Sequence, residues 1–257
     1  MKTIAIMNFK GGVGKTVTTI NMAAELANRG KRVVVIDADG QRNLSSFFGA
    51  DTDNGGTLYD VLTGDAEPFY GELLQETQVE RVKILPASMK LIHADLSALK
   101  DGTVNLMAVS ELVATIAEDD AADYVLIDCP PSFSASTTAA LAAADEVIIP
   151  LRLDAFSLAG MDELLYQIGE MRQVNPRLKV AGVLVTMWYI AKAEVEAEKA
   201  LRSLRVPVFR QMIHRTVAVE KSTFMKKPLR VFAPNCSAAL DYAGLVDEYL
   251  KNGGAAK

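Results

Sequence analysis

The stretch FKGGVGKTVTT, residues 9–19, decides the fold of this chain because it combines three glycines with a lysine and a threonine. A short apolar run, TIAIMN at residues 3–8, precedes it, and a segment with helical spacing of apolar residues follows it. Strand, glycine-rich loop and helix in this order are the context of a phosphate-binding loop. The glycines let the backbone curl around a phosphate, whose charge is bound by N–H groups and by the positive end of the helix.

This loop predicts which residues hold a nucleotide. The Lys15 ammonium should reach the β- and γ-phosphates, and the Thr16 hydroxyl should bind Mg²⁺. The long form of the motif opens with a glycine where this chain has Phe9, and the motif does not require a lysine at Lys10. The expected nucleotide-binding residues are Gly11, Gly12, Val13, Gly14, Lys15, Thr16 and Val17.

Two other apolar runs end in acidic residues. KRVVVIDAD at 31–39 ends with Asp37 and Asp39, and YVLID at 124–128 ends with Asp128. Near-continuous apolar runs are typical of parallel strands that are covered on both faces. Because ligands of doubly wound sheets bind at the carboxyl ends of strands, we expect the three carboxylates near the phosphates.

The remaining pattern alternates strands with helices, which predicts an α/β fold with a doubly wound, mostly parallel sheet and helices on both faces. We expect one domain over residues 1–251 and a short flexible tail over 252–257. Further strands are expected at 82–85, 146–150 and 180–186. Helices are expected at 16–28, 58–62, 104–118, 155–174, 194–204 and 237–250.

Composition narrows the class of protein. The chain has 257 residues and a formal charge of −5, so any binding to nucleic acid must come from a local basic patch. No segment approaches the roughly 20 apolar residues of a membrane span, and the apolar N-terminus is too short for a signal peptide. We therefore expect a soluble cytoplasmic protein. Cys129 and Cys236 have no metal-like spacing and are expected to be small structural side chains.

The motif KGGVGKT resembles the deviant phosphate loop of the ParA/MinD class of P-loop ATPases. Four further stretches resemble the same class, and the resemblance covers nearly the whole chain. It is closest to ParA/Soj-type DNA partition proteins. The stretches are GKRVVVIDADGQRN at 30–43, YVLIDCPPS at 124–132, PLRLDAFSLAGMDEL at 150–164 and GVLVTM at 182–187.

The resemblance gives Lys10 a role. In the family the early lysine crosses the interface of an ATP-bound dimer and contacts the phosphates held by the other subunit. Lys10 would then stabilise the transferred phosphoryl group. The alternative is a solvated Lys10 that helps only its own loop. The catalytic residues implied by the resemblance are Lys10, Lys15 and Asp39.

The resemblance also assigns the acids and the adenine site. Asp39 would position the attacking water, Asp37 would help to arrange the magnesium shell, and Asp128 would hold Mg²⁺ through a water. Capping of the strand end is the alternative for Asp37. The metal-binding residues are thus expected to be Thr16, Asp37 and Asp128. The adenine contacts are expected to be Thr186, Met187 and Pro207.

Two positions depart from the family pattern. Val17 replaces a second threonine, which removes a hydroxyl that could touch the α-phosphate but leaves the backbone N–H. Gly40 replaces the proline of an Asp-Pro-Gln segment and widens the backbone choices there, so hydrolysis could be slower or differently gated.

The stretch FRQMIHRTVAVEKSTFMKKPLR, residues 209–230, is a basic segment with one acid, Glu220. Such a patch suits phosphate binding on an acidic protein, although a solvated basic face is the alternative. Arg215 matches the arginine of the family's IPRN motif, whereas His214 is expected to be a satisfied loop histidine. The expected DNA-binding residues are Arg210, Arg215, Lys221, Lys226 and Lys227, and Arg230 adds to the charge.

The C-terminal stretch DYAGLVDEYLKNGGAAK argues against a membrane helix. Its apolar positions have helical spacing, but Asp241, Asp247 and Glu248 dominate the polar face, where a membrane-surface helix needs lysine and arginine. We expect this helix to pack against the core and the protein to have no membrane partner.

The resemblance implies a weak, partner-stimulated Mg²⁺-dependent ATPase that converts ATP and water to ADP and phosphate. Its ATP-bound homodimer would bind double-stranded DNA nonspecifically, associate with the nucleoid, and segregate a plasmid or chromosome with a ParB-like partner. The alternative is an ATP-dependent positioning switch that recruits a protein complex without binding DNA. A metabolic ATP-dependent ligase of the same fold is a third possibility, which would lack a lysine equivalent to Lys10.

Overall fold

A single seven-stranded sheet organises the chain in the computed structural model, which describes residues 1–53, 56–66, 70–100, 102–154 and 160–253. Its strand order is β3-β4-β2-β5-β1-β6-β7, and every neighbouring pair is parallel except β3 with β4. The strands are β1 (Lys2–Ile6), β2 (Val33–Asp37), β3 (Gln75–Glu76), β4 (Val82–Leu85), β5 (Tyr124–Asp128), β6 (Glu146–Arg152) and β7 (Lys179–Thr186).

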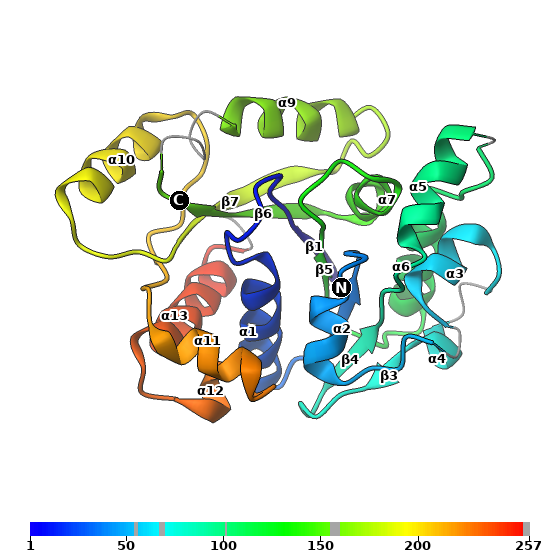
Figure 1. Cartoon of the computed structure of the whole chain (residues 1–257), viewed down its shortest axis with the longest axis horizontal. Coiled ribbons are helices and arrows are strands. Elements are labelled where there is room, and N and C mark those ends of the chain that lie inside the picture. Colours follow the sequence, from blue (N-terminus) through cyan, green and yellow to red (C-terminus); the bar gives the residue numbers. More distant parts are fainter. Residues whose placement is uncertain (54–55, 67–69, 101, 155–159, 254–257) are drawn as a thin grey trace.

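Helices cover both faces of the sheet (Figure 1). The helices packed on one face are α1 (Lys15–Asn28), α2 (Asn43–Phe48), α11 (Val217–Phe224), α12 (Leu229–Phe232) and α13 (Ser237–Lys251). The other face carries α3 (Leu58–Thr63), α5 (Leu91–Lys100), α6 (Ala108–Glu118), α7 (Ala135–Ala143) and α9 (Met161–Met171). The short α4 (Tyr70–Leu73) and the peripheral α10 (Lys192–Ser203) complete the helices described.

The alternation of side chains along each strand explains the two layers. Ile4 and Ile6 of β1 enter the core beneath α1, whereas Ala5 and Met7 enter the core on the opposite face. Successive residues of a strand point to opposite faces, so a strand covered on both sides must be apolar throughout. The predicted doubly wound α/β fold is confirmed.

Most predicted elements occur at nearly the expected residues, but several helices were not predicted. The clearest omission is α7, whose sequence ASTTAALAA is buried almost all round and therefore lacks an apolar stripe. Its start is capped by Ser134, whose side chain accepts a hydrogen bond from the N–H of Thr137. The first residues of the helix predicted at 155–174, and the end of the predicted tail, lie outside the described residues.

The last helix packs against the core as predicted. Tyr242, Leu245, Val246 and Tyr249 of α13 are buried. The expectation that the acids of this helix form a solvated face was wrong for Asp241, which is buried and binds His214 through its N–H and Nδ1 at 2.8 and 2.9 Å. His214 is therefore a satisfied loop histidine. No helix among the described residues is long and apolar enough to cross a membrane.

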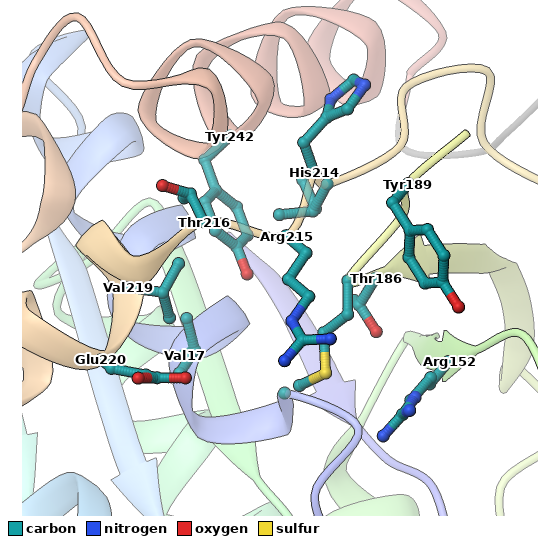
Figure 2. A pocket seen from close by; sticks show the side chains of 13 residues that line it. Val17, Arg152, Thr186, Tyr189, His214, Arg215, Thr216, Val219, Glu220 and Tyr242 are labelled. Carbon is teal, nitrogen blue, oxygen red and sulfur yellow. The ribbon is translucent and has the colours of Figure 1, made fainter. Parts of the chain in front are cut away.

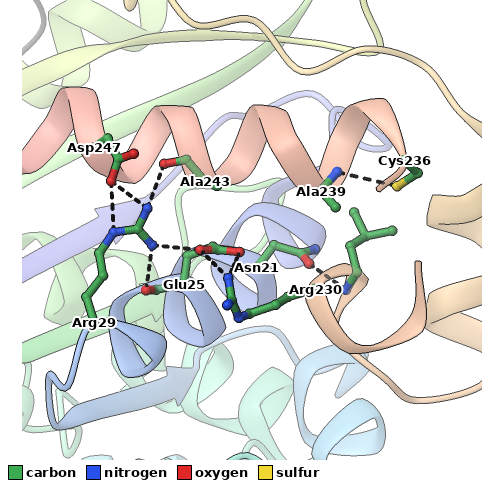
Figure 3. Close-up of polar contacts among 9 residues, drawn as sticks. Asn21, Glu25, Arg29, Arg230, Cys236, Ala239, Ala243 and Asp247 are labelled. Atoms are coloured by element: carbon green, nitrogen blue, oxygen red, sulfur yellow. Dashed lines mark hydrogen bonds and ion pairs between the residues drawn. The ribbon is translucent and has the colours of Figure 1, made fainter. Parts of the chain in front are cut away.

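A polar network joins α1 to α12 and α13 (Figure 3). The buried Glu25 of α1 pairs with Arg29 at 2.6 Å and with Arg230 of α12 at 3.3 Å. Asn21, one turn earlier, accepts a hydrogen bond from the N–H of Leu229 at 2.9 Å. Helix α1, which starts at the glycine loop, is thus bonded directly to Leu229 and Arg230 at the end of the basic segment.

Glu25→Gln should lower the free energy of unfolding by about 2 kcal/mol. This is less than the loss of a fully buried pair, because both arginines are partly exposed. Asp247→Asn is the matched control, since Asp247 also pairs with Arg29 but is largely exposed, and it should cost less than about 1 kcal/mol. Urea unfolding of both variants measures the difference, and equal losses would contradict the importance assigned to Glu25.

Candidate functional site

The glycine loop connects β1 to α1 and forms a concave turn of the main chain. Gly12 and Gly14 have φ angles of +71° and +89°, which only glycine adopts without strain. Gly14 immediately precedes α1, so its position combines free N–H groups with the positive end of the helix dipole. Thr186 at the end of β7 donates a hydrogen bond to the carbonyl of Val13 at 2.8 Å and fixes the loop from the other side.

Lys15 lies inside this turn. Its ammonium donates to the carbonyls of Asn8 and Lys10 at 2.9 and 3.1 Å. Burial lowers the pKa of Lys15, and the opposing influence comes mainly from the nearby Asp128 carboxylate. A buried cation whose hydrogen bonds to the described residues go to carbonyl oxygens is prepared for a stronger anionic partner, such as a phosphate.

Lys10 has a partner within its own chain. Its ammonium lies 2.7 and 2.5 Å from the two carboxylate oxygens of Asp154, which follows β6. Both side chains are about one-third exposed. The ammonium is therefore held at the rim of the loop and within reach of solvent, whereas Lys15 is buried.

Asp37 and Asp128 are brought together at the carboxyl ends of neighbouring strands, where β2 and β5 pair these two residues directly. Asp37 accepts hydrogen bonds from the N–H and hydroxyl of Ser45 at 2.8 and 2.6 Å, and from the N–H of Asp39 at 3.2 Å. Burial raises the pKa of Asp37 to about 6 despite these bonds. Asp37 thus fixes the start of α2, and its role in the magnesium shell stays a prediction.

Asp128 carries the feature that best fits a metal site. It is buried, and burial together with the charge of Asp37 raises its pKa to about 8. Thr16 and Thr19 hydrogen-bond to this carboxyl, but its Oδ2 atom accepts no hydrogen bond from the described residues. An orphaned carboxylate oxygen beside a threonine hydroxyl is a suitable donor set for Mg²⁺ or for a magnesium-bound water.

Asp39 lies just beyond β2 and is half-buried. Its carboxylate accepts a hydrogen bond from the N–H of Gln41 at 2.9 Å, which turns the chain toward α2. The adjacent Gly40 does not have a positive φ, and an added Cβ would meet only Leu91 and Ser88 at 3.8 and 3.9 Å. The backbone of the described segment therefore does not itself require the glycine at this position.

A cavity of about 190 Å³ lies beside the glycine loop (Figure 2). Thr186 and Met187, both predicted to contact adenine, line it together with Gly14 and Val17. Pro207 does not line it, because the chain at Pro207 runs beside Val183, before the end of β7. In its place, residues 213–216 line the cavity. They are held there by the hydrogen bond that the N–H of Trp188 donates to the carbonyl of Ile213.

The structure separates Arg215 from the other basic residues of its segment. Arg215 is itself exposed, but its guanidinium points into the cavity beside the glycine loop, which Arg152 and Tyr189 also line (Figure 2). Arg230 is tied to Glu25 by an ion pair. The remaining basic side chains predicted to bind DNA are exposed; they are Arg210, Lys221, Lys226 and Lys227.

Sequence reasoning missed three residues of this site. Ser45, the partner of Asp37, lies in the first turn of α2, a helix with no strong sequence signal, and Arg152 and Tyr189 reach the cavity only through the sheet order. Arg152 lies two residues beyond the strand predicted at 146–150, on the side where ligands bind, so its position was the one available signal.

The sheet, the glycine loop with its buried lysine, and the orphaned carboxylate oxygen together define a P-loop nucleotide-binding protein. Residues 1–180 match the family model described as AAA domain. The chain is 36% identical to the chromosome-partitioning ATPase Soj of Thermus thermophilus, covering 97% of this chain and 96% of the relative. It is 34% identical to the chromosome partitioning protein ParA of Myxococcus xanthus, covering 97% and 88%.

A solved structure, titled cobyrinic acid a,c-diamide synthase from Mycobacterium smegmatis with bound ATP analog and magnesium, superposes with a TM-score of 0.83. The two are 29% identical over 100% of this chain and 99% of that one. The chain belongs to the ParA/MinD family of P-loop ATPases, as its motifs predicted. It is therefore an ATPase, and the solved neighbour holds an ATP analog and magnesium.

The free energy of unfolding of the nucleotide-free protein should fall as pH rises from about 4 to about 8. In this window the folded chain keeps a proton on Asp128 that the unfolded chain loses, so deprotonation favours unfolding. Asp37 contributes only up to about pH 6.

Asp128→Asn should therefore flatten the profile between pH 6 and 8, as measured by urea unfolding at several pH values. Asp53→Asn, in an exposed loop, is the control and should leave the profile unchanged. Parallel profiles for Asp128→Asn and the parent protein would contradict the raised pKa.

Proposed function

We propose that the protein is a ParA-type partition ATPase. On binding ATP and Mg²⁺ two chains form a dimer, the dimer binds double-stranded DNA nonspecifically, and a ParB-like partner stimulates hydrolysis to reset it. The cargo is a plasmid or a chromosome, and the ATP-bound form associates with the nucleoid. The names of the curated relatives support the partition role, since both are chromosome-partitioning proteins.

The observation that carries the proposal is the position of the basic segment relative to the phosphate loop. Thr16 of the loop and Lys226 of the basic segment line the same groove, whose floor includes Ile20 and Phe47. Leu229 and the neighbouring arginine of α12 are bonded to α1, the helix that begins at the loop. Bound nucleotide can therefore bias the position of exposed lysines through directly bonded elements.

Within the site each residue has a separate task in the proposed cycle. Lys15 and the loop N–H groups hold the phosphates, while Asp39, half-exposed at the switch segment, orients the attacking water. Magnesium, when bound, neutralises charge on the phosphate oxygens, and Thr16 and Asp128 would hold it. Lys10 leaves Asp154 and contacts the phosphates of the second chain, where it stabilises charge that develops during transfer.

A second function, recruitment of a protein complex without DNA, is favoured by one surface. Met89, Ile92 and Leu96 are exposed at helical spacing along and just before α5. Apolar side chains in a row on a helix are typical of a protein-binding face. Leu91 of the same helix lies close to the switch segment, because a Cβ added at Gly40 would be 3.8 Å from it.

The DNA function predicts binding that requires ATP. Affinity for a mixed-sequence duplex should be strong with ATP and weak with ADP or no nucleotide, and it should fall steeply with salt because phosphate contacts release counterions. Fluorescence anisotropy at several salt concentrations measures both. Because the proposed dimer carries two copies of each lysine, replacing Lys221, Lys226 and Lys227 by alanine should reduce the salt slope by up to about 5. Alanine at Lys192 and Lys199 of α10 is the control.

If no nucleotide state binds DNA while ATP still drives dimerisation, the protein-recruiting function replaces the DNA function. DNA binding that ignores nucleotide would also contradict the proposed cycle.

Lys10→Ala should still bind ATP but should neither dimerise nor hydrolyse it at the parent rate. Its physical basis is that Lys15 and the loop N–H groups remain, while the cation that reaches the second chain is lost. Light scattering with ATP measures dimerisation, and phosphate release measures hydrolysis. Lys83→Ala, on β4 far from the loop, is the matched control, and normal dimerisation of Lys10→Ala would refute the role of Lys10.

A further inference from the structure

Phe224, the last residue of α11, is the most exposed aromatic side chain described, with 88% of its surface accessible. Residues of this type are usually buried, so an almost fully exposed phenylalanine indicates a contact surface. It belongs to a stripe of α11 with Val217 and Lys221, which lie seven and three residues earlier and are also exposed. Positions spaced in this way share one face of a helix.

The surroundings of Phe224 are strongly basic. Lys221 precedes it on the same face, and Lys226 and Lys227 follow it directly after the helix; all three are exposed. The only acid of the segment, Glu220, lines both the cavity beside the glycine loop and the groove that Phe224 and Lys226 line, so one carboxylate stands against three lysines there. The aromatic ring is therefore flanked by cations on both sides along the chain.

We infer that Phe224 is a DNA-contacting wedge, which inserts between base steps while Lys221, Lys226 and Lys227 bind the phosphates on either side. This inference rests on the proposed DNA function. It adds an uncharged residue to the DNA contacts, which a search for basic side chains would not have found. Exposed apolar side chains flanked by cations are what proteins insert into a duplex to unstack a base step. An aromatic contact of this kind is indifferent to sequence, as nonspecific binding requires.

Duplex DNA fits this surface better than a lipid surface does. A helix that lies in a membrane interface needs a broad apolar face along its length. The stripe on α11 alternates Val217, Lys221 and Phe224 over eight residues, and Ser222 on its inner side is buried in the protein. A narrow apolar tip between lysines matches a base step between two phosphate backbones.

The test uses the full-length protein with ATP and a 30-base-pair mixed-sequence duplex that contains 2-aminopurine, whose fluorescence rises when the base is unstacked. The parent protein should bind and raise this fluorescence. Phe224→Ala should bind about tenfold more weakly, with an unchanged salt slope, and should not raise the fluorescence. Phe224→Trp should restore both. Loss of lysines, by contrast, should reduce the salt slope.

Tyr166→Ala is the matched control, because Tyr166 is an exposed aromatic residue on α9, on the other face of the sheet. It should behave as the parent protein. Since Phe224 is exposed, its replacement should leave the urea unfolding midpoint unchanged, which separates lost contact from lost folding.

Equal DNA affinity and equal fluorescence for Phe224→Ala and the parent would overturn the inference and leave the DNA function intact. If the parent itself fails to bind DNA in any nucleotide state, the proposed function fails, and this inference fails with it. A parallel titration with phosphatidylglycerol vesicles gives the remaining outcome. Vesicle binding that depends on Phe224, with DNA binding that does not, would overturn the inference in favour of a lipid surface.

Discussion

The structure depends on burying ionisable groups at one edge of a parallel sheet. Lys15 and Asp128 both lie in the interior. Removing either side chain would leave the other buried without this ionisable partner, which would destabilise the fold. The Asn8 carbonyl and the glycine loop, which follow β1, and the Thr186 hydroxyl at the end of β7 surround this edge with polar groups from two strands. One carboxyl oxygen of Asp128 accepts no hydrogen bond from the described residues, which suits it to a cation. In the proposed function, nucleotide and magnesium supply the partners of these groups.

The helical layers on the two faces of the sheet contact different parts of the site at that edge. On one face α1 leads from the phosphate loop into a core shared with α12 and α13, and polar bonds fix this layer to the basic segment. On the other face α5 and α7 pack near the switch segment that follows β2. A conformational change at the site can be transmitted to both layers. On one face Asn21 of α1 is hydrogen-bonded to Leu229 of α12, and on the other face Ser136 of α7 is hydrogen-bonded to the carbonyl of Ala38, beside Asp39.

The fold and the phosphate site could be predicted because their signals are local. A strand buried on both faces must be apolar along its whole length, and a loop that wraps a phosphate needs glycine at Gly12 and Gly14. The helix α7 escaped prediction because it is buried all round and has no polar face. Arg152 and Tyr189 meet only because β6 and β7 are neighbours, and the inward turn of Arg215 follows from the bridge between Trp188 and His214. Such contacts depend on topology, which a local pattern does not encode.

The ion pair between Lys10 and Asp154 gives the resting chain a built-in counterion. A partly exposed pair of this kind contributes at most about 1 kcal/mol, so Lys10 can exchange its carboxylate for a phosphate at little cost. In the proposed dimer, each chain would perform this ion exchange once, and the two released carboxylates would face the new interface. Assembly is then a reversible exchange of anions, and its equilibrium responds to ionic strength even before any DNA is present.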